Sequence, residues 1–194
     1  MGHLVVQQFV TIDGFAANLD NEFTAYELLD GRTDEFDRSQ VDWLAGVDAM
    51  VLGATTYRMF VGYWPTPAAA EEIVAAPLNA LGRHVFSRTL RHAPWGDLPP
   101  ATLESGDAVE AIRRIKAEYA GLVVLWGSLS LSRAFFAAGE VDEVRLVVMP
   151  VVIGAGRGVF PADTDPSVLD LRGARTFDDG LVEVHYALRA APEW

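Results

Sequence analysis

Cysteine is absent from this chain of 194 residues, and lysine occurs once, at Lys116. Without cysteine the chain has no disulfide framework, no cysteine-ligated zinc or iron–sulfur centre and no thiol nucleophile. Any redox chemistry must therefore come from a bound cofactor. Basic residues are also few, since 15 stand against 27 acidic ones. The resulting net charge of −12 argues against a general nucleic-acid binder, which needs a basic surface.

Long apolar runs are absent as well. One of the longest, residues 146–153, contains Pro150 and is eight residues long, whereas a membrane helix needs about 20. The first ten residues carry no basic cluster and turn polar at Gln7 and Gln8, so we expect no signal peptide. The four histidines have no paired spacing, so we expect no metal site. These absences predict a cytoplasmic protein that binds neither membrane nor nucleic acid.

The composition is that of a folded protein, with 51% hydrophobic and 22% charged residues. No linker or repeat divides the chain, so we predict one domain, 1–194. Apolar strand patterns alternate with helical patterns until two β segments follow one another near the end. This order predicts an α/β fold with a mixed, mostly parallel central sheet flanked by helices and an antiparallel C-terminal edge. The expected strands are 4–12, 49–53, 84–87, 122–126, 141–153 and 181–188, and the expected helices are 34–47, 55–61, 68–76, 105–119 and 129–138.

Three turns that follow strands are candidates for ligand binding, because α/β sheets bind ligands beyond the carboxyl ends of their strands. In the first turn, Gly53 ends a strand, and Thr55 and Thr56 open a helix whose free N–H groups attract phosphate. Simple capping of the helix by Thr55 is an equally good interpretation.

The second turn has the sequence Trp-Gly-Ser-Leu-Ser. Gly127 allows a ligand close to the backbone, and the hydroxyl groups and N–H groups of Ser128, Leu129 and Ser130 supply donors at a helix start. It lacks the three glycines of a dinucleotide fingerprint and the flanking glycines of a nucleophile elbow. Capping alone remains an alternative for this turn too.

The third turn lies in a basic segment. Residues 73–96 contain no acid, and residues 83–92 hold three arginines and two histidines. Ser87 and Arg88 directly follow a strand, and the guanidinium group of arginine pairs in bidentate fashion with a phosphate monoester. A solvated basic loop is the alternative. A later glycine-rich segment, 154–158, follows a β segment without opening a helix, and we interpret it as an exposed turn that could form a wall of the substrate site.

Together these segments resemble the dihydrofolate reductase-like proteins related to the reductase domain of the riboflavin-biosynthesis enzyme. The resemblance covers nearly the whole chain. It implies a dihydrofolate reductase-like fold with NADPH as hydride donor, in which the Gly53 and Gly127 turns bracket the pyrophosphate and Ser87 and Arg88 meet the adenosine 2′-phosphate. The segments that carry it are Thr11-Ile12-Asp13-Gly14, Leu52-Gly53-Ala54-Thr55-Thr56-Tyr57, Tyr63-Trp64-Pro65, Val85-Phe86-Ser87-Arg88, Trp126-Gly127-Ser128-Leu129-Ser130-Leu131, Val141-Asp142-Glu143-Val144-Arg145-Leu146 and Pro150-Val151-Val152-Ile153-Gly154.

Two departures from that family concern the substrate. The riboflavin-pathway reductases are expected to have a lysine about six residues before the strand-end aspartate, where this chain has Gln7. This difference weakens the case for their phosphorylated ribose substrate. The catalytic acid that dihydrofolate reductases carry on a helix also has no clear counterpart, since Asp34 and Asp37 fall on what reads as a solvated helix start.

The leading hypothesis is a reductase that transfers a hydride from NADPH to a small heteroaromatic or imine-like substrate of pterin, folate or aminopyrimidine type. Asp13 is the candidate acid, although an Asp-Gly pair also forms turns. Two alternatives remain: an NADP(H)-binding protein without reductase activity, and a non-enzymatic scaffold that dimerises. A homodimer is expected, with residues 146–153 pairing with their copy. The candidate aromatic walls of the substrate site, each of which could equally be core, are Phe15, Phe23, Tyr26 and Trp64.

Overall fold

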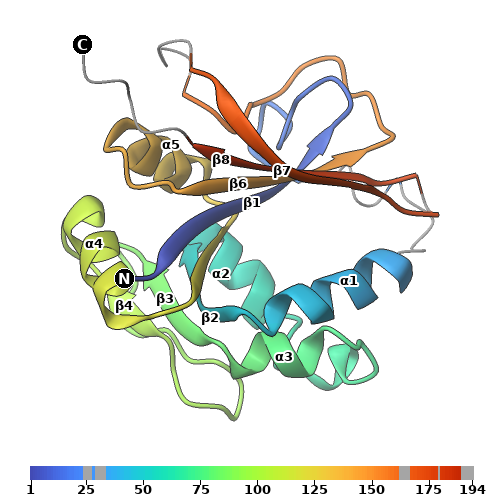
Figure 1. Cartoon of the computed structure of the whole chain (residues 1–194). Coiled ribbons are helices and arrows are strands. Elements are labelled where there is room, and N and C mark those ends of the chain that lie inside the picture. Colours follow the sequence, from blue (N-terminus) through green and yellow to red (C-terminus); the bar gives the residue numbers. More distant parts are fainter. Residues whose placement is uncertain (24–27, 29–33, 162–166, 179, 189–194) are drawn as a thin grey trace, which may run out of the picture.

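The computed structural model describes residues 1–23, 28, 34–161, 167–178 and 180–188. Within this part of the chain the strands form one sheet with the order β4-β3-β2-β5-β1-β6-β8-β7 (Figure 1). The strands are β1 (His3–Thr11), β2 (Val47–Gly53), β3 (Gly82–Phe86), β4 (Thr102–Glu104), β5 (Leu122–Trp126), β6 (Glu143–Met149), β7 (Leu169–Thr176) and β8 (Val182–Leu188). The helices are α1 (Asp34–Leu44), α2 (Ala54–Val61), α3 (Ala75–Ala80), α4 (Ala108–Glu118) and α5 (Leu129–Ala137), and a short 3-10 turn, η2, spans Pro67–Ala69.

The direction of the strands confirms the predicted fold class. The six strands from β4 to β6 in the sheet order run parallel to their neighbours. Strand β8 runs antiparallel to both β6 and β7 and so forms the antiparallel edge. Because the parallel strands all point the same way, the turns after β1, β2, β3 and β5 come together at one edge of the sheet.

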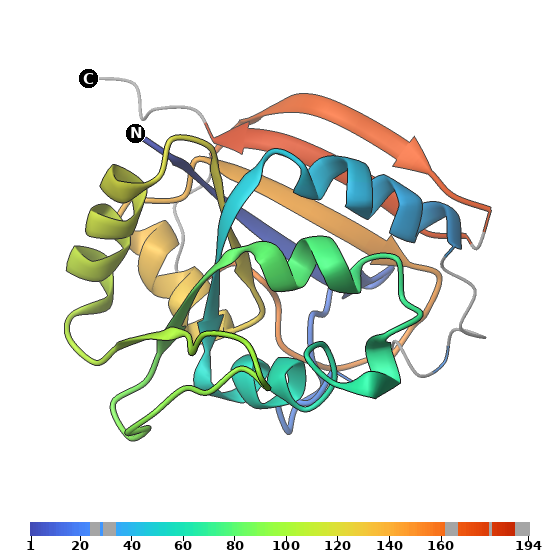
Figure 2. The same ribbon diagram turned by 90° about the horizontal axis from the view of Figure 1, so that it is seen from below.

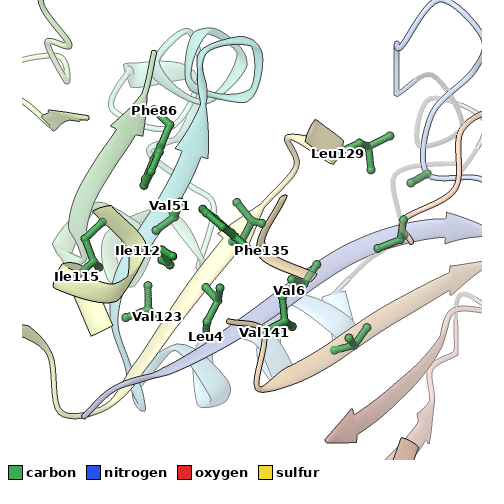
Figure 3. Packing of buried hydrophobic residues seen from close by; sticks show 14 of the residues in the cluster. Leu4, Val6, Val51, Phe86, Ile112, Ile115, Val123, Leu129, Phe135 and Val141 are labelled. Atoms are coloured by element: carbon green, nitrogen blue, oxygen red, sulfur yellow. The ribbon is translucent and has the colours of Figure 1, made fainter. Parts of the chain in front are cut away.

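The helices cover both faces of the sheet, as the two views show (Figures 1 and 2). On one face, α4 and α5 pack on β1, β2 and β5, and Ile112, Ile115 and Phe135 are fully buried there (Figure 3). On the other face, α1, α2 and α3 pack over a second core that contains Leu44, Tyr57 and Leu78. Burial of apolar side chains on both faces is what holds a parallel sheet together.

Local sequence explains why α4 begins where it does. The side chain of Asp107 accepts hydrogen bonds from the backbone N–H groups of Val109 (2.9 Å) and Glu110 (3.0 Å), which caps the helix. Of the two expected capping residues, Ser105 and Asp107, the structure therefore selects Asp107.

Two of the expected helices differ from the structure. The helix expected over 34–47 ends at Leu44, and Val47 begins β2. The helix expected over 68–76 is wrong, because η2 and α3 stand in its place. Helix α3 includes Pro77 in its first turn, where proline is tolerated because the N–H group that it lacks would be unpaired anyway.

The sequence prediction also missed two strands. Strand β4 is three residues long. Strand β7 lies at the edge of the sheet, where most of its residues are exposed, so it shows no apolar alternation.

The proposed pairing of residues 146–153 with a second copy is wrong. Both edges of β6 are already hydrogen-bonded, one to β1 and the other to β8. The strand ends at Met149, directly before Pro150. Among the described residues no helix is both long and apolar enough to cross a membrane.

Candidate cofactor cleft and active site

A cleft of about 1380 Å³ opens where β1, β2, β3 and β5 end and α2, α4 and α5 begin. It is larger than the roughly 300–1,000 Å³ of most small-molecule sites, so it has room for a ligand of dinucleotide size. All nine residues predicted to bind the cofactor line this one cleft. They are Gly53, Thr55, Thr56, Ser87, Arg88, Gly127, Ser128, Leu129 and Ser130.

The turns after β2 and β5 fit closely against each other. Gly127 has a φ of +62°, in the left-handed region, and a β-carbon there would overlap the hydroxyl group of Thr56. A β-carbon on Gly53 would in turn overlap the side chain of Ser128. Glycine at both positions therefore lets the two turns approach each other at the middle of the cleft.

The first turn of α2 has no capping side chain. Gly53 stands at the N-cap position and makes no side-chain cap bond, so Thr55 does not cap this helix. Thr55 is exposed and lines the cleft. The free N–H groups of the first helical turn thus face a cleft wall that also carries hydroxyl groups, which is the arrangement that binds phosphate.

In the second turn, the residue that caps the helix also lines the cleft. Ser128 has a φ of +50°, an uncommon conformation for a residue other than glycine. Its hydroxyl oxygen accepts a hydrogen bond of 3.4 Å from the N–H group of Leu131, so Ser128 caps α5. Backbone conformations of this kind concentrate at functional sites.

Of the basic segment after β3, Arg88 is the residue whose charge reaches the cleft. Its side chain is exposed, lines the cleft, and makes no ion pair with any residue that the structure describes. Arg83 instead donates hydrogen bonds to carbonyl oxygens of Asn79 (2.6 Å) and Leu81 (3.1 Å) in its own neighbourhood. The hydroxyl oxygen of Ser87 accepts hydrogen bonds from the turn that carries Arg88.

The acid-free stretch of sequence is not acid-free in space. Glu104 on β4 lies opposite Phe86 on β3 and lines the cleft. Its carboxylate is 3.0 Å from Nδ1 of His84 and 2.5 Å from the guanidinium group of Arg114. Burial raises the pKa of Glu104, but the hydrogen bonds from Arg114 and His84 outweigh it, so the net pKa is lowered. Glu104 is therefore a paired carboxylate within the basic end of the cleft.

The sequence prediction missed the wall that α4 contributes. Residues 104–109, from the end of β4 to the first turn of α4, line the cleft beside the turn after β3. The signal for it, a helix start directly after a strand, was hidden because β4 is so short. The N–H groups of α4 that face this wall are partly taken by Asp107.

The end of the cleft at β1 is lined by apolar and polar side chains together. The apolar ones are Ala16, Ala17 and Phe23, and the polar ones include Gln8, Asn21 and Glu22. Arg157, from the glycine-rich segment after β6, also lines the cleft, and its guanidinium group donates to the carbonyl oxygen of Leu19 at 3.1 Å. The interpretation of residues 154–158 as a wall of the site therefore agrees with this placement.

Asp13 does not line the cleft. Its exposed carboxylate accepts hydrogen bonds from the backbone N–H groups of Ile153 (3.3 Å) and Gly154 (2.8 Å), so it fastens the turn after β1 to the segment after β6. A hydrogen bond from the side chain of Thr11 lowers the pKa of Asp13, and those backbone bonds lower it further. A carboxyl group with a lowered pKa holds a proton poorly, so these contacts support the turn-forming role over the acid role.

Another carboxyl group, missed by sequence reasoning, lies at the β1 end of the cleft. Glu22 lines both the cleft and an adjoining hollow, next to Phe23. One of its carboxylate oxygens accepts a hydrogen bond of 3.2 Å from the side chain of Asn18, and the carboxylate is exposed. Nothing in the local sequence distinguishes Glu22 from other surface acids.

The predicted aromatic walls divide into three groups. Phe23 lines the cleft, and Phe15 lines the adjoining hollow together with it. Trp64 does not line the cleft. It is half-buried and packs against Phe60 and Tyr63, a position that favours the core alternative. Tyr26 lies outside the described residues.

Gln7, at the position of the expected lysine, does not line the cleft. Gln7 is buried, and its side-chain amide exchanges two hydrogen bonds with the amide of Gln40 on α1, at 2.9 and 3.1 Å. The oxygen of Gln7 also accepts a hydrogen bond from the indole N–H group of Trp126. Both the oxygen and the nitrogen of the Gln7 side chain are thus bonded within the protein, and the side chain is buried outside the cleft.

A comparison with known proteins places this geometry in a family. The profile of the RibD C-terminal domain matches residues 2–182. The chain belongs to the RibD C-terminal domain family. Since this match covers most of the sequence, it confirms the resemblance inferred from the strand-end turns.

Individual relatives and solved structures resemble this chain over most of its length. The uncharacterized protein YyaP of Bacillus subtilis is 26% identical over 186 residues, which cover 94% of this chain and 93% of YyaP. RibD of Acinetobacter baumannii superposes with a TM-score of 0.70 at 16% identity, over 97% of this chain and 58% of RibD. A dihydrofolate reductase of Enterococcus faecalis, solved in complex with NADP(H), superposes with a TM-score of 0.63 at 13% identity, over 97% of both chains. At these identities the structures show a shared dihydrofolate reductase-like fold.

Proposed function

We propose that this member of the RibD C-terminal domain family is an NADPH-dependent reductase that transfers a hydride to a small heteroaromatic or imine-like substrate. The observation that carries the proposal is the gathering of three anion-binding elements in one cleft. These are the open start of α2, the start of α5 and the free guanidinium group of Arg88. The bound cofactor would supply the hydride.

The order of these elements matches the order of groups in NADPH. Along the sheet, Arg88 follows β3, the Gly53 turn follows β2, and the Gly127 turn follows β5, next to β1. A cofactor lying across the strand ends with its 2′-phosphate at Arg88 would have its pyrophosphate between the two glycine turns. Its nicotinamide would then lie at the β1 end, beside Phe23, Ala16 and Ala17, whose apolar side chains would shield one side of the ring from water.

Proton delivery to the substrate needs a group at the same end of the cleft. Among the described residues the acids that line the cleft are Glu22, Glu104 and Asp107. Glu104 is bonded to His84 and Arg114, and Asp107 caps α4. We therefore propose Glu22 as the proton donor, and we assign to Asp13 the fastening of the loop beside it.

Titration with NADPH and NADH tests the cofactor assignment. Replacement of Arg88 by alanine should weaken NADPH binding by about 1.5–3 kcal/mol, the range for hydrogen bonds to charged groups, and leave NADH binding unchanged. Arg91→Ala is the matched control, because Arg91 is exposed on the same segment but does not line the cleft. Equal losses for the two nucleotides would disprove the 2′-phosphate site.

Turnover is tested by a screen for NADPH oxidation with dihydropterins, dihydrofolate, aminopyrimidines and quinones. On a substrate that is reduced, Glu22→Gln should lower kcat about 10²–10⁴-fold, as expected for loss of a general acid. Asp13→Asn should change kcat much less. Tight NADPH binding without oxidation by any substrate would favour the alternative of a binding protein without reductase activity.

A homodimer remains part of this proposal, but through a different surface. On the side of the sheet that faces α5, strands β6, β8 and β7 extend beyond that helix with apolar side chains that are exposed or half-buried, namely Leu146, Val148, Leu171, Val184 and Tyr186. Sedimentation at several concentrations should show a dimer that Leu171→Glu weakens. A monomer at all concentrations would refute it.

A further inference from the structure

Two adjacent glutamines on β1 point to opposite faces of the sheet and differ in their bonding. Gln7 faces α1, and Gln40 and Trp126 satisfy its amide. Gln8 is on the side of α5 and lines the cleft. Its side-chain oxygen Oε1 is shielded from solvent and has no hydrogen-bond partner among the described residues.

An unsatisfied amide of this kind calls for an explanation. Buried polar side-chain atoms nearly always have a hydrogen-bond partner, and one without a partner destabilises the folded protein. A primary amide offers an acceptor oxygen and two N–H donors, so a ligand that satisfies it fully has to offer both a donor and an acceptor. Another carboxamide does so, as the reciprocal pair of Gln7 and Gln40 shows in this protein.

A second shielded atom of the residues that line the cleft lacks a partner of the opposite kind within the described chain. The nitrogen Nε of Arg133 on α5 is shielded from solvent and has no partner in the described part of the chain, and Arg133 also lines the cleft. An N–H group requires an acceptor, whereas Oε1 of Gln8 requires a donor. A carboxamide supplies both, while a carboxylate or a phosphate supplies acceptors alone.

The register of the sheet places Gln8 at one end of the proposed cofactor site. The last paired residues of β1 and β5 are Gln7 and Trp126, so Gln8 stands level with the Gly127 turn. Strand β1 continues to Thr11, paired there with β6, after β5 has ended. Arg88 follows β3, and β3 is three strand spacings, about 14 Å, from β1. Gln8 is therefore three strand spacings from the Arg88 turn and one from the Gly127 turn, on the side where a nicotinamide ring would lie.

We propose that the side-chain amide of Gln8 binds a primary carboxamide, that of the nicotinamide ring, through the kind of reciprocal pair that Gln7 makes with Gln40. This inference rests on the proposed function and adds to it a residue that binds the nicotinamide end of the cofactor. Fixing the carboxamide fixes the rotation of the ring about its glycosidic bond. Gln8 thereby determines which face of the ring is turned toward the substrate.

The test compares three ligands on the wild type and on Gln8→Leu, a variant of similar size without the amide. The ligands are NADPH, its reduced 3-acetylpyridine analogue, in which a methyl group replaces the amide nitrogen, and 2′,5′-ADP, which has no nicotinamide. We expect the wild type to bind NADPH about tenfold more tightly than the acetylpyridine analogue, the scale of one hydrogen bond. Gln8→Leu should bind those two equally and keep the wild-type Kd for 2′,5′-ADP.

A measurement on the free protein separates binding from folding. Because Gln8→Leu removes a buried polar atom without a partner, the melting temperature of the free variant should equal or exceed that of the wild type. A variant that still prefers NADPH over the acetylpyridine analogue would overturn the role of Gln8, and so would equal binding of the two by the wild type. A wild type that binds neither NADPH nor 2′,5′-ADP would overturn the proposed function, and this inference with it.

Discussion

The two sides of β1 use polar side chains in opposite ways. On the side of α1, buried polar groups pair with one another: the amide of Gln7 bonds to Gln40 and Trp126, and Arg145 forms an ion pair with Glu183 at 2.6 Å. Of these groups, Nη1 of Arg145 and the paired oxygen of Glu183 lack a hydrogen bond within the described chain. On the side of the cleft, Gln8, Arg88 and the start of α2 have polar groups that the described chain leaves without partners. The first arrangement stabilises the fold and the second is suited to bind a ligand. Substitutions on the two sides should therefore change different measured quantities.

The largest effect is expected from Glu183→Leu on the closed side. Arg145 is buried, its guanidinium group lies 4.1 Å from the ring centroid of Trp43, and Glu183 is its ion-pair partner. Removal of one partner of a buried pair leaves an uncompensated charge and should lower the free energy of unfolding by about 3–5 kcal/mol. Urea denaturation measures this loss, while the Kd for NADPH of the remaining folded protein should not change.

The double variant Arg145→Met, Glu183→Leu is the control for that experiment. With both charges removed, most of the lost stability should return, because a well-packed apolar pair replaces a buried ion pair at little cost. A single variant that loses less than about 1 kcal/mol would mean that the pair is solvated like a surface salt bridge.

A smaller loss of stability is expected from Gln7→Leu. This change leaves the buried amide of Gln40 and the indole N–H group of the half-buried Trp126 without their partner, and an unsatisfied buried group costs about 1–3 kcal/mol. The double variant Gln7→Leu, Gln40→Leu should recover part of the loss in urea denaturation. The contrast with Gln8→Leu is direct, since the adjacent residue should lose affinity and no stability. Equal loss of stability at the two glutamines would remove the distinction between the two sides.

The strand-end turns could be predicted from the sequence because their signals are local. A glycine that ends an apolar strand, followed by hydroxyl residues at a helix start, is recognisable at Gly53 and Gly127, and both turns line the cleft. The partners of these turns were not predictable, because they depend on packing. Nothing in the local sequence shows that Asp13 bonds to the backbone of Ile153 and Gly154. Nor does it show that Glu104 lies on the strand next to the acid-free segment.

The secondary structure, too, was predictable where the signal is local and not where it depends on packing. Strand β5 has the predicted bounds because all five of its residues are apolar. Strand β7 was missed because an exposed edge strand has no buried face to impose a pattern. The expected helix 68–76 stopped before Pro77, whereas in the structure Pro77 lies in the first turn of α3.

On the open side, Gly127→Ala should weaken NADPH binding about tenfold, and it should also lower the stability of the free protein. Alanine at a φ of +62° costs about 1–2 kcal/mol, and its β-carbon would push against Thr56 and separate the two turns. Gly106→Ala is the control, because Gly106 lines the same cleft with open space around it and no positive φ. Isothermal titration of both variants makes the comparison. Equal affinities would show that the close approach of the turns does not matter for binding.

The smallest effect is expected at Glu104, which lines the cleft yet is bonded like a residue of the closed side. Its pKa is lowered in the folded protein, so the unfolded chain binds its proton first as the pH falls. The stability that Glu104 contributes is therefore fully present above its ordinary pKa and is lost as the pH falls through the lowered one. One such group changes the free energy of unfolding by at most about 1.4 kcal/mol per pH unit.

Glu104→Gln should flatten the fall in the free energy of unfolding between neutral and strongly acidic pH. Glu110→Gln removes the same charge from an exposed position on α4, where the contacts with His84 and Arg114 are missing, and should leave the slope as in the wild type. Glu104 lines the cleft together with Arg88, the proposed 2′-phosphate site. The same variant therefore separates a role of Glu104 in stability from a role in cofactor binding. If Glu104→Gln tightened NADPH binding strongly and left the acid slope unchanged, Glu104 would belong with the open side, as a charge that opposes the phosphate.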